Sequence, residues 1–217
     1  GPLLAVSRLT KHYAVRSGFF GRARDVVHAV DDVSFAISDG ETLGLVGESG
    51  CGKSTIARTV LRLVEPTSGS IEWRGRPIEQ LAGGEMRPYR RELQAVFQDP
   101  YASLNPRMRA ADIVAEPIRN FETASSEAIA GRVRALFERV GLRGDQMARY
   151  PYEFSGGQRQ RLGIARALAL QPKLIVCDEP VSALDVSIQA QVLNLLKQLQ
   201  RDLGLTYVFV AHNMGVV

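Results

Sequence analysis

The stretch from residue 42 to residue 64 constrains the fold of this chain more than any other. A short apolar segment, residues 42–46, has the composition of a buried strand, and a glycine-rich run follows it. After the glycines, apolar residues recur at the spacing of one helix face: Ile56, Val60, Leu63 and Val64. The sequence therefore predicts a strand, a glycine-rich turn and a helix in direct succession, an arrangement typical of an α/β fold.

The glycine-rich turn has a pattern that binds phosphate. Residues 47–55 read Gly-Glu-Ser-Gly-Cys-Gly-Lys-Ser-Thr and fit G-x-x-x-x-G-K-[ST]. Glycines let the backbone curl so that N–H groups point at phosphate oxygens, and the following helix adds the positive end of its dipole. Lys53 supplies a charge for the β- and γ-phosphates, and Ser54 a hydroxyl for Mg²⁺. We therefore expect a nucleoside triphosphate site formed by Gly47, Ser49, Gly50, Cys51, Gly52, Lys53, Ser54 and Thr55.

Composition narrows the possible partners and the compartment. The 217 residues suit one large domain or two small ones, and the net charge of +4 is spread along the chain. Because nucleic-acid-binding proteins concentrate positive charge in a stripe, we expect no nucleic-acid partner. The positions of Cys51 and Cys177 indicate no disulfide and favour a reducing compartment. No apolar run is long enough to span a membrane, so we expect a soluble chain that reaches a membrane through a partner.

The remaining chain alternates strand and helix patterns. Strands are predicted at residues 3–13, 27–37, 71–75, 93–97, 174–177 and 207–210, with an exposed loop over 16–25 and a turn over 66–70. Amphipathic helices are predicted at residues 129–140 and 188–203, and a third helix follows a loop over residues 150–158. The region from Gln98 to about residue 164 has the pattern of a helical insert in an α/β core.

Two acids follow the most apolar of these strands. Residues 174–177 form a continuous apolar run, typical of a parallel strand that is covered on both faces, and Asp178 and Glu179 come next. Side chains at the carboxyl end of such a strand face the ligand crevice of an open α/β sheet. We therefore expect Asp178 to hold Mg²⁺, directly or through water, and Glu179 to act as the general base that activates water.

The stretch Phe154-Ser155-Gly156-Gly157-Gln158 selects a family. Alone, Ser-Gly-Gly-Gln is a plausible start of a helix. Placed after a phosphate loop and before the Asp178–Glu179 pair, it resembles the ATP-binding-cassette family, whose signature is usually Leu-Ser-Gly-Gly-Gln; Phe154 replaces the leucine. The resemblance implies a P-loop NTPase (RecA-like) core with an antiparallel β subdomain and an α-helical subdomain. Residues 1–97 and 165–217 would form the nucleotide-binding core, and residues from about 98 to 164 the helical subdomain.

The same resemblance implies roles for further residues. Gln98 would sense the γ-phosphate and contribute to the metal site, and His212 would be the switch histidine that contacts the γ-phosphate. Ser155, Gly157 and Gln158 would cap the γ-phosphate of a nucleotide held by an opposing subunit. Asp185 would lie in the loop that lines the dimer interface. Tyr13 would stack on adenine, with Phe19 and Phe20 as competitors, whereas His12 and His28 are interpreted as surface residues.

Three further runs narrow the resemblance. Residues 45–53, 97–106 and 182–191 are similar to the ATPase subunits of oligopeptide and dipeptide importers, and residues 153–161 to the second of their two ATPases. This implies ATP and Mg²⁺ as cofactors and a hetero- or homodimer with a second such ATPase. It also implies permease partners at the cytoplasmic face of a bacterial inner membrane, supplied by a solute-binding protein. Family members continue past the switch histidine, so we expect a truncated chain.

Two other functions share these nucleotide motifs. An ATPase of DNA repair or chromosome structure would carry a long heptad repeat between the phosphate loop and the signature, and the interval from Thr55 to Ser155 has none. A non-catalytic ATP-binding switch module would have lost its base or its lysine, whereas Glu179 and Lys53 are both present. The intact set of motifs favours an ATPase over both.

Overall fold

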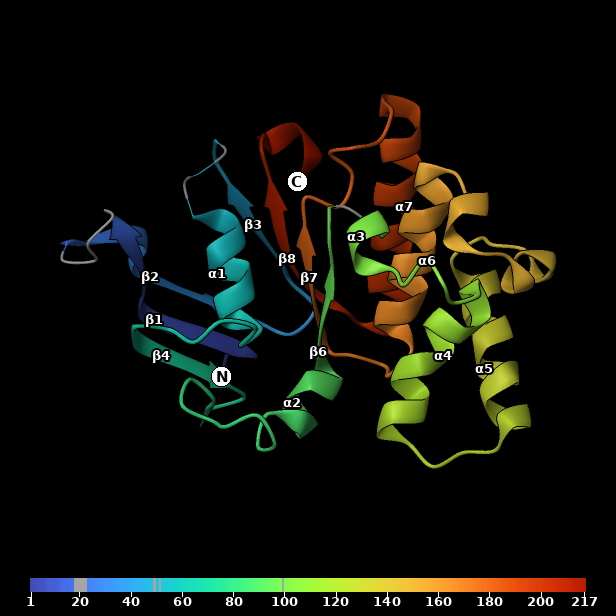
Figure 1. The fold of residues 1–217 in the computed structure, drawn as a ribbon, viewed down its shortest axis with the longest axis horizontal. Coiled ribbons are helices and arrows are strands. Elements are labelled where there is room, and N and C mark those ends of the chain that lie inside the picture. The colour runs from blue at the N-terminus through green and yellow to red at the C-terminus, as the bar shows by residue number, and fades with distance from the viewer. Residues whose placement is uncertain (18–22, 49, 51, 99) are drawn as a thin grey trace.

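The computed structural model describes residues 1–17, 23–48, 50, 52–98 and 100–217 (Figure 1). It contains two four-stranded sheets, with strand orders β2-β1-β4-β5 and β3-β8-β7-β6. Neighbouring strands are antiparallel in the first sheet and parallel in the second. The α/β fold expected from the sequence is thus confirmed, because a parallel sheet with helices is joined to an antiparallel sheet.

The two central strands of the parallel sheet are buried on both faces. The strands of this sheet are β3 (Thr42–Val46), β8 (Thr206–Ala211), β7 (Leu174–Asp178) and β6 (Leu93–Val96). Successive residues of β7 enter two different cores: Leu174 and Val176 pack on one side of the sheet, and Ile175 and Cys177 on the other. This alternation explains why residues 174–177 are apolar without interruption.

Helix α1 (Lys53–Val60) lies between the two sheets. The antiparallel sheet is formed by β1 (Leu4–Ser17), β2 (Ala23–Ile37), β4 (Ser68–Trp73) and β5 (Arg76–Pro77). One hydrophobic core joins its inner face, the buried side of α1 and the near face of the parallel sheet. The phosphate loop that precedes α1 is therefore placed where the two sheets meet.

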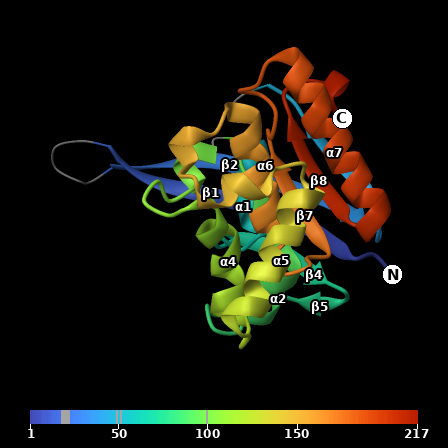
Figure 2. The same ribbon diagram turned by 90° about the vertical axis from the view of Figure 1, so that its right-hand side faces the viewer.

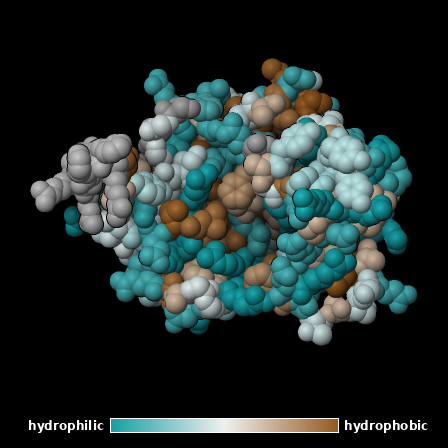
Figure 3. Space-filling view, in the orientation of Figure 1, coloured by the Kyte–Doolittle hydropathy of each residue, from teal (hydrophilic) through white to brown (hydrophobic). Residues whose placement is uncertain are grey.

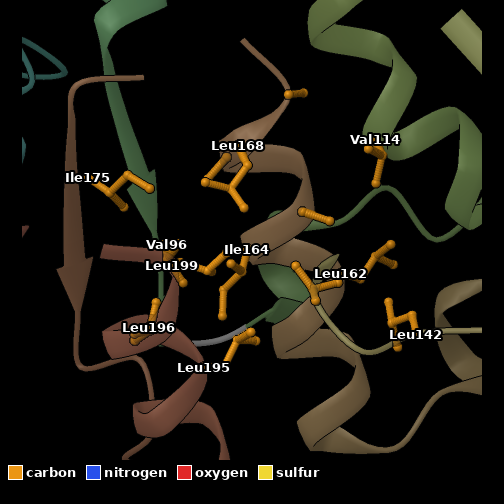
Figure 4. Close-up of a cluster of buried hydrophobic side chains, with 14 of the residues drawn as sticks. Val96, Val114, Leu142, Leu162, Ile164, Leu168, Ile175, Leu195, Leu196 and Leu199 are labelled. Atoms are coloured by element: carbon orange, nitrogen blue, oxygen red, sulfur yellow. The ribbon is translucent and has the colours of Figure 1, made fainter. Parts of the chain in front are cut away.

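The other face of the parallel sheet is covered by helices (Figures 1 and 2). Helices α6 (Gly156–Leu168) and α7 (Val186–Leu203) lie against the sheet, and α3 (Pro100–Ser103), α4 (Ala110–Phe121) and α5 (Ser126–Arg139) pack around α6. Figure 4 shows the core that α6 and α7 form with β6 and β7, through side chains such as Leu162, Ile164, Leu196 and Ile175. Shorter elements are α2 (Arg87–Glu92) and the 3-10 helices η1 (Gly144–Ala148), η2 (Pro151–Glu153) and η3 (Met214–Val216). Within the described residues, every helix is too short or too polar to cross a membrane.

The prediction of a loop over residues 16–25 is wrong at both ends of that range. Strands β1 and β2 continue as a ribbon in which Arg16 pairs with Arg24 and Ser17 with Ala23. Backbone hydrogen bonds of an antiparallel ladder are available to any residue except proline, so the ribbon persists where the side chains carry no apolar pattern. Phe19 and Phe20, the competitors of Tyr13, lie outside the described residues.

The helix after the phosphate loop is shorter than its apolar spacing predicts. It ends at Val60, because Arg62 adopts a left-handed conformation with φ 54° and the N–H of Leu63 bonds back to the Arg58 carbonyl at 2.9 Å. The Arg62 guanidinium is buried and donates to the carbonyls of Ile78 and Leu81 at 3.2 Å. A tertiary contact thus fixes this helix end.

Two further boundaries differ from the expectation. Strand β4 starts at Ser68, inside the expected turn, because Ser68 and Ser70 pair with Thr10 and Ser7 of β1. Helix α6 begins at Gly156, two residues before the expected loop ends at Gln158. Pairing with β1 extends β4 into the expected turn, whereas a local pair of hydrogen bonds between Ser155 and Gln158 starts α6 inside the expected loop.

Candidate functional site

The parallel sheet brings four predicted segments to one edge. Its strands all run in the same direction, so their carboxyl ends meet there. The phosphate loop follows β3, Asp178 ends β7, His212 follows β8 and Gln98 follows β6. Residues separated by more than a hundred positions are therefore neighbours in the fold.

Glycine is required at two described positions of the phosphate loop. Gly50 and Gly52 have φ of 84° and 90°, a left-handed conformation that side chains disfavour. A Cβ at Gly52 would also collide with the carbonyl oxygen of Ala29 in β2, so the loop lies directly against that strand. Ser49 and Cys51 lie outside the described residues.

Two side chains at the start of α1 point into this edge. Lys53 is buried, and its Nζ donates to the carbonyl oxygens of Gly47 and Glu48, the second at 2.7 Å. The hydroxyl of Ser54 donates to Oδ1 of Asp178 at 3.1 Å. Burial raises the pKa of Asp178, the hydrogen bond from Ser54 lowers it, and the nearby Glu179 carboxylate raises it again. A hydroxyl and a carboxylate from distant segments thus form a pair of oxygen ligands of the kind that Mg²⁺ prefers.

The next residue, Glu179, is held in an unusual backbone conformation. Its φ is 50°, which is rare for a residue other than glycine, and its N–H bonds to the Val210 carbonyl at 2.9 Å. The side chain is 11% exposed, and its Oε1 lies 2.8 Å from Nε2 of His212. A cavity of about 190 Å³ adjoins the pair. The carboxylate is therefore partly buried and oriented by a histidine, an arrangement suited to a general base.

Three predicted residues have no described contact to this group. Gln98 is exposed and lies two residues beyond Val96. Val96 pairs with Cys177 in the sheet, and Glu179 lies two residues beyond Cys177. Tyr13 on β1 is 37% exposed, with the Lys11 ammonium 5.0 Å from its ring centroid. Thr55 is half-buried in the first turn of α1. Their roles stay predictions.

The signature residues lie apart from the sheet-edge group, at the N-terminus of α6 (Figure 1). Ser155 accepts a hydrogen bond from the Gln158 N–H at 3.2 Å, and the Gln158 side chain accepts one from the Ser155 N–H at 3.0 Å. This reciprocal pair is a capping box. A Cβ at Gly157 would lie 2.6 Å from the Ile188 side chain on α7, so the helix start needs a glycine there. Asp185, the residue before α7, is exposed.

One further residue was missed by the sequence analysis. Gln160 is 2% exposed, and its Nε2 donates to the carbonyls of Phe97 at 3.3 Å and Pro180 at 2.7 Å. These carbonyls belong to the residues next to Gln98 and Glu179, so Gln160 joins two loops of the sheet edge to α6. The available signal was its place on the apolar stripe of Ile164 and Leu168, where a buried polar side chain needs partners.

Comparison with known proteins identifies the family. The sequence model of the ABC transporter family matches residues 30–182, more than half of the chain. The chain belongs to the ABC transporter family.

Curated relatives of this ABC transporter protein have names that refer to peptides and glutathione. The chain is 54% identical over 215 residues to the probable peptide ABC transporter ATP-binding protein y4tS of Sinorhizobium fredii, covering 99% of this chain and 61% of the relative. It is 51% identical to the oligopeptide transport ATP-binding protein OppF of Salmonella typhimurium, covering 99% of this chain and 65% of OppF. It is 53% identical to the glutathione import ATP-binding protein GsiA of Salmonella paratyphi A, covering 100% and 35%. The chain thus spans about a third to two thirds of these relatives.

Solved ABC transporter structures share the fold. The dimeric post-hydrolysis state of the cassette MJ0796 bound to ADP and Pi superposes with a TM-score of 0.86 at 30% identity, covering 98% of this chain and 89% of that one. The protein cbiO1 of Clostridium perfringens, part of the ABC transporter complex cbiONQ, superposes with a TM-score of 0.83 at 26% identity, covering 100% of this chain and 80% of that one. These neighbours are ATP-binding cassettes, in agreement with the P-loop NTPase core expected from the sequence.

Proposed function

We propose that this chain is the ATP-hydrolysing domain of an importer of peptides or related small solutes. The observation that carries the proposal is the arrangement at one sheet edge, where Lys53 bonds to carbonyls of the phosphate loop, Ser54 bonds to Asp178, and Glu179 pairs with His212. The names of the relatives, which refer to peptide, oligopeptide and glutathione transport, support the solute class. A chain with a nucleotide site of this kind and such relatives fits the energy-converting part of a transporter.

In this proposal the phosphate loop binds ATP. Backbone N–H groups around Gly50 and Gly52, with the N-terminus of α1, face the phosphates, and Lys53 moves its ammonium from loop carbonyls to phosphate oxygens. Ser54 and Asp178 would hold Mg²⁺, which would supply positive charge against the phosphates. Tyr13 stacks on the adenine from the ribbon of β1.

Hydrolysis needs a water that loses a proton as it attacks the γ-phosphorus. Glu179 accepts that proton, because its carboxylate is partly buried and its orientation is fixed by His212. His212 contacts the γ-phosphate, and Gln98 senses whether that phosphate is present. The bond to the leaving ADP breaks as the new P–O bond forms, which yields ADP and inorganic phosphate.

We further propose that two such domains close head to tail around two ATP molecules. The capping box orients Ser155 and Gly157 at a helix N-terminus, a group that binds phosphate, and the partner's nucleotide would sit there. Asp185 would lie at the interface, where the next residue, Val186, is 82% exposed. The dimeric cassette MJ0796 is a precedent for such closure. The second ATPase is either an identical or a related chain.

Closure would act on permease subunits at the cytoplasmic face of a bacterial inner membrane. We propose residues 1–97 and 165–217 as the nucleotide-binding core and residues from about 98 to 164 as the helical subdomain. A groove of about 340 Å³ lies where α1, β6 and α4 meet, and Figure 3 shows apolar side chains over this region. Leu63, Phe97 and Phe121 line the groove, which suits an apolar permease segment, and Gln98 follows Phe97 in the sequence. A solute-binding protein would deliver the solute to those subunits.

The two rival functions have less support. Between Thr55 and Ser155 the longest helix of the described residues is α5, with 14 residues, which is too short for the coiled coil of a chromosome-structure ATPase. A passive ATP-binding switch needs no oriented base, whereas Glu179 and His212 are paired.

The decisive experiment is ATP turnover of the full-length protein with its permease subunits, for wild type and Glu179→Gln. We expect Glu179→Gln to lower kcat about 10²- to 10⁴-fold with ATP binding retained, because the general base is lost. Glu138→Gln, on the exposed face of α5, is the matched control and should turn over ATP like wild type. Unchanged turnover in Glu179→Gln would exclude this residue as the base.

The same variant tests closure. If Glu179→Gln traps ATP, the solution mass of the isolated protein should double with Mg-ATP, which would show pairing of identical chains. A monomer that still binds ATP would contradict self-pairing and favour a related partner ATPase.

A further inference from the structure

Three side chains of types that can bind metal ions, those of His12, His28 and Asp31, lie together on the β1–β2 ribbon. Nε2 of His12 lies 2.5 Å from Oδ1 of Asp31, and Nδ1 of His28 lies 3.5 Å from the same oxygen. The two imidazole centroids are 4.0 Å apart. One donor atom from each residue falls within 4.8 Å of the others. Two imidazoles and a carboxylate at this spacing match the ligand set of many transition-metal sites.

A β-bulge creates this cluster. His12 is the direct partner of His28, whereas the preceding residue, Lys11, is the partner of Val30, so Ala29 is an extra residue in β2. In a regular strand, positions three apart point to opposite faces. The extra residue turns Asp31 to the same face as His28, opposite the buried Val30. The bulge thus brings together three side chains that an uninterrupted pair of strands would place on different faces of the sheet.

We propose that His12, His28 and Asp31 form a surface site for a divalent late first-row transition-metal ion such as Zn²⁺, Ni²⁺ or Co²⁺. In a tetrahedral site with metal–ligand bonds of about 2.0–2.2 Å, ligand atoms lie about 3.4 Å apart. The side chains need to move by only about 1 Å to reach this spacing. They are free to do so, because His12, His28 and Asp31 are 26%, 57% and 58% exposed. A water would take the remaining position.

The site would affect the nucleotide-binding edge through the ribbon. The bulge residue, Ala29, is the one whose carbonyl contacts Gly52 of the phosphate loop, and Tyr13 follows His12 in β1. A bound ion would join β1 to β2 at the point where β2 supports that loop. Because the ion binds only the folded ribbon, the melting temperature should rise with the free ion concentration once that concentration exceeds Kd.

The test is a calorimetric titration of Zn²⁺ into the full-length, Mg²⁺-free protein. We expect one site per chain whose affinity falls more than about tenfold in His12→Ala, in His28→Ala and in Asp31→Asn, since each loses a ligand. Asp32→Asn is the matched control, because Asp32 is an exposed neighbour that pairs with Arg8 instead. His212→Ala controls for the remaining histidine. Both controls should bind Zn²⁺ like wild type.

The absorption spectrum of bound Co²⁺ provides a second measurement. Co²⁺ bound by nitrogen and oxygen gives d–d bands without thiolate charge transfer, so its absorption spectrum distinguishes this site from one that uses a cysteine. We expect the d–d bands to disappear in the His12→Ala/His28→Ala double variant, with the metal-free melting temperature close to wild type. Zn²⁺ affinity that survives in the double variant, or a thiolate band, would overturn the proposal.

Discussion

At the carboxyl edge of the parallel sheet, side chains contact partners that are far away in the sequence, whereas at the N-terminus of α6 they contact close neighbours. Ser54 reaches Asp178, 124 positions away, and Glu179 reaches His212. Ser155 and Gln158 bond to each other within one helical turn. The first group depends on the sheet for its geometry, and the second is formed by a local motif.

The sheet edge and the start of α6 therefore depend on different properties of their residues. The sheet edge supplies charged and acid–base groups, which can bind a nucleotide or act on it only when they are correctly placed relative to one another. The start of α6 supplies backbone N–H groups and glycines, and Gly157 is required because Ile188 packs against it. Loss of an edge side chain should therefore cost binding or chemistry, whereas loss of an α6 residue should first cost helix stability.

The largest expected effect on nucleotide binding is that of Lys53→Ala. Charge-assisted hydrogen bonds contribute about 1.5–3 kcal/mol, so ATP affinity should fall about 10- to 100-fold. Fluorescence titration with a labelled ATP analogue measures this, and Lys197→Ala on the exposed side of α7 is the control. Equal ATP affinity in Lys53→Ala and Lys197→Ala would show that the edge does not bind phosphate.

A smaller effect is expected where the two regions are connected. Gln160→Leu leaves the carbonyls of Phe97 and Pro180 without their donor, which should lower the free energy of unfolding by about 1–3 kcal/mol. Gln198→Leu makes the same chemical change at an exposed position of α7 and should have little effect. Urea unfolding of both variants gives the comparison. If the two variants are equally stable, Gln160 does not join the regions.

The smallest effect on stability is expected at the capping serines. Ser155 caps α6 and Ser125 caps α5, where it accepts a bond from the Ala128 N–H at 3.1 Å. Replacing either with alanine should lower the free energy of unfolding by about 1 kcal/mol. Only Ser155→Ala should also lower ATP turnover, since only Ser155 is proposed to meet a nucleotide. Turnover that falls equally in both variants would reduce the role of Ser155 to helix capping.

Local sequence signals predicted the parts of the protein that local forces form. The phosphate loop, the apolar run of residues 174–177 and the amphipathic helices follow from glycine conformation and from side-chain periodicity. The position of Asp178 after a buried strand, together with strand direction, was sufficient to expect it beside Ser54. Ser155 was also readable as a helix start, because a helix cap forms within a few residues of sequence.

The tertiary structure decided what depends on long-range pairing. Strands β1 and β2 extend into both ends of the expected loop because each provides the other's hydrogen-bond partners, and α1 ends early because the Arg62 guanidinium binds carbonyls beyond β5. The bulge at Ala29 turns two histidines that were interpreted as surface residues, together with Asp31, into one cluster. A sequence states which residues are present and how they alternate. Register, bulges and buried polar contacts are chosen by the free energy of the whole fold.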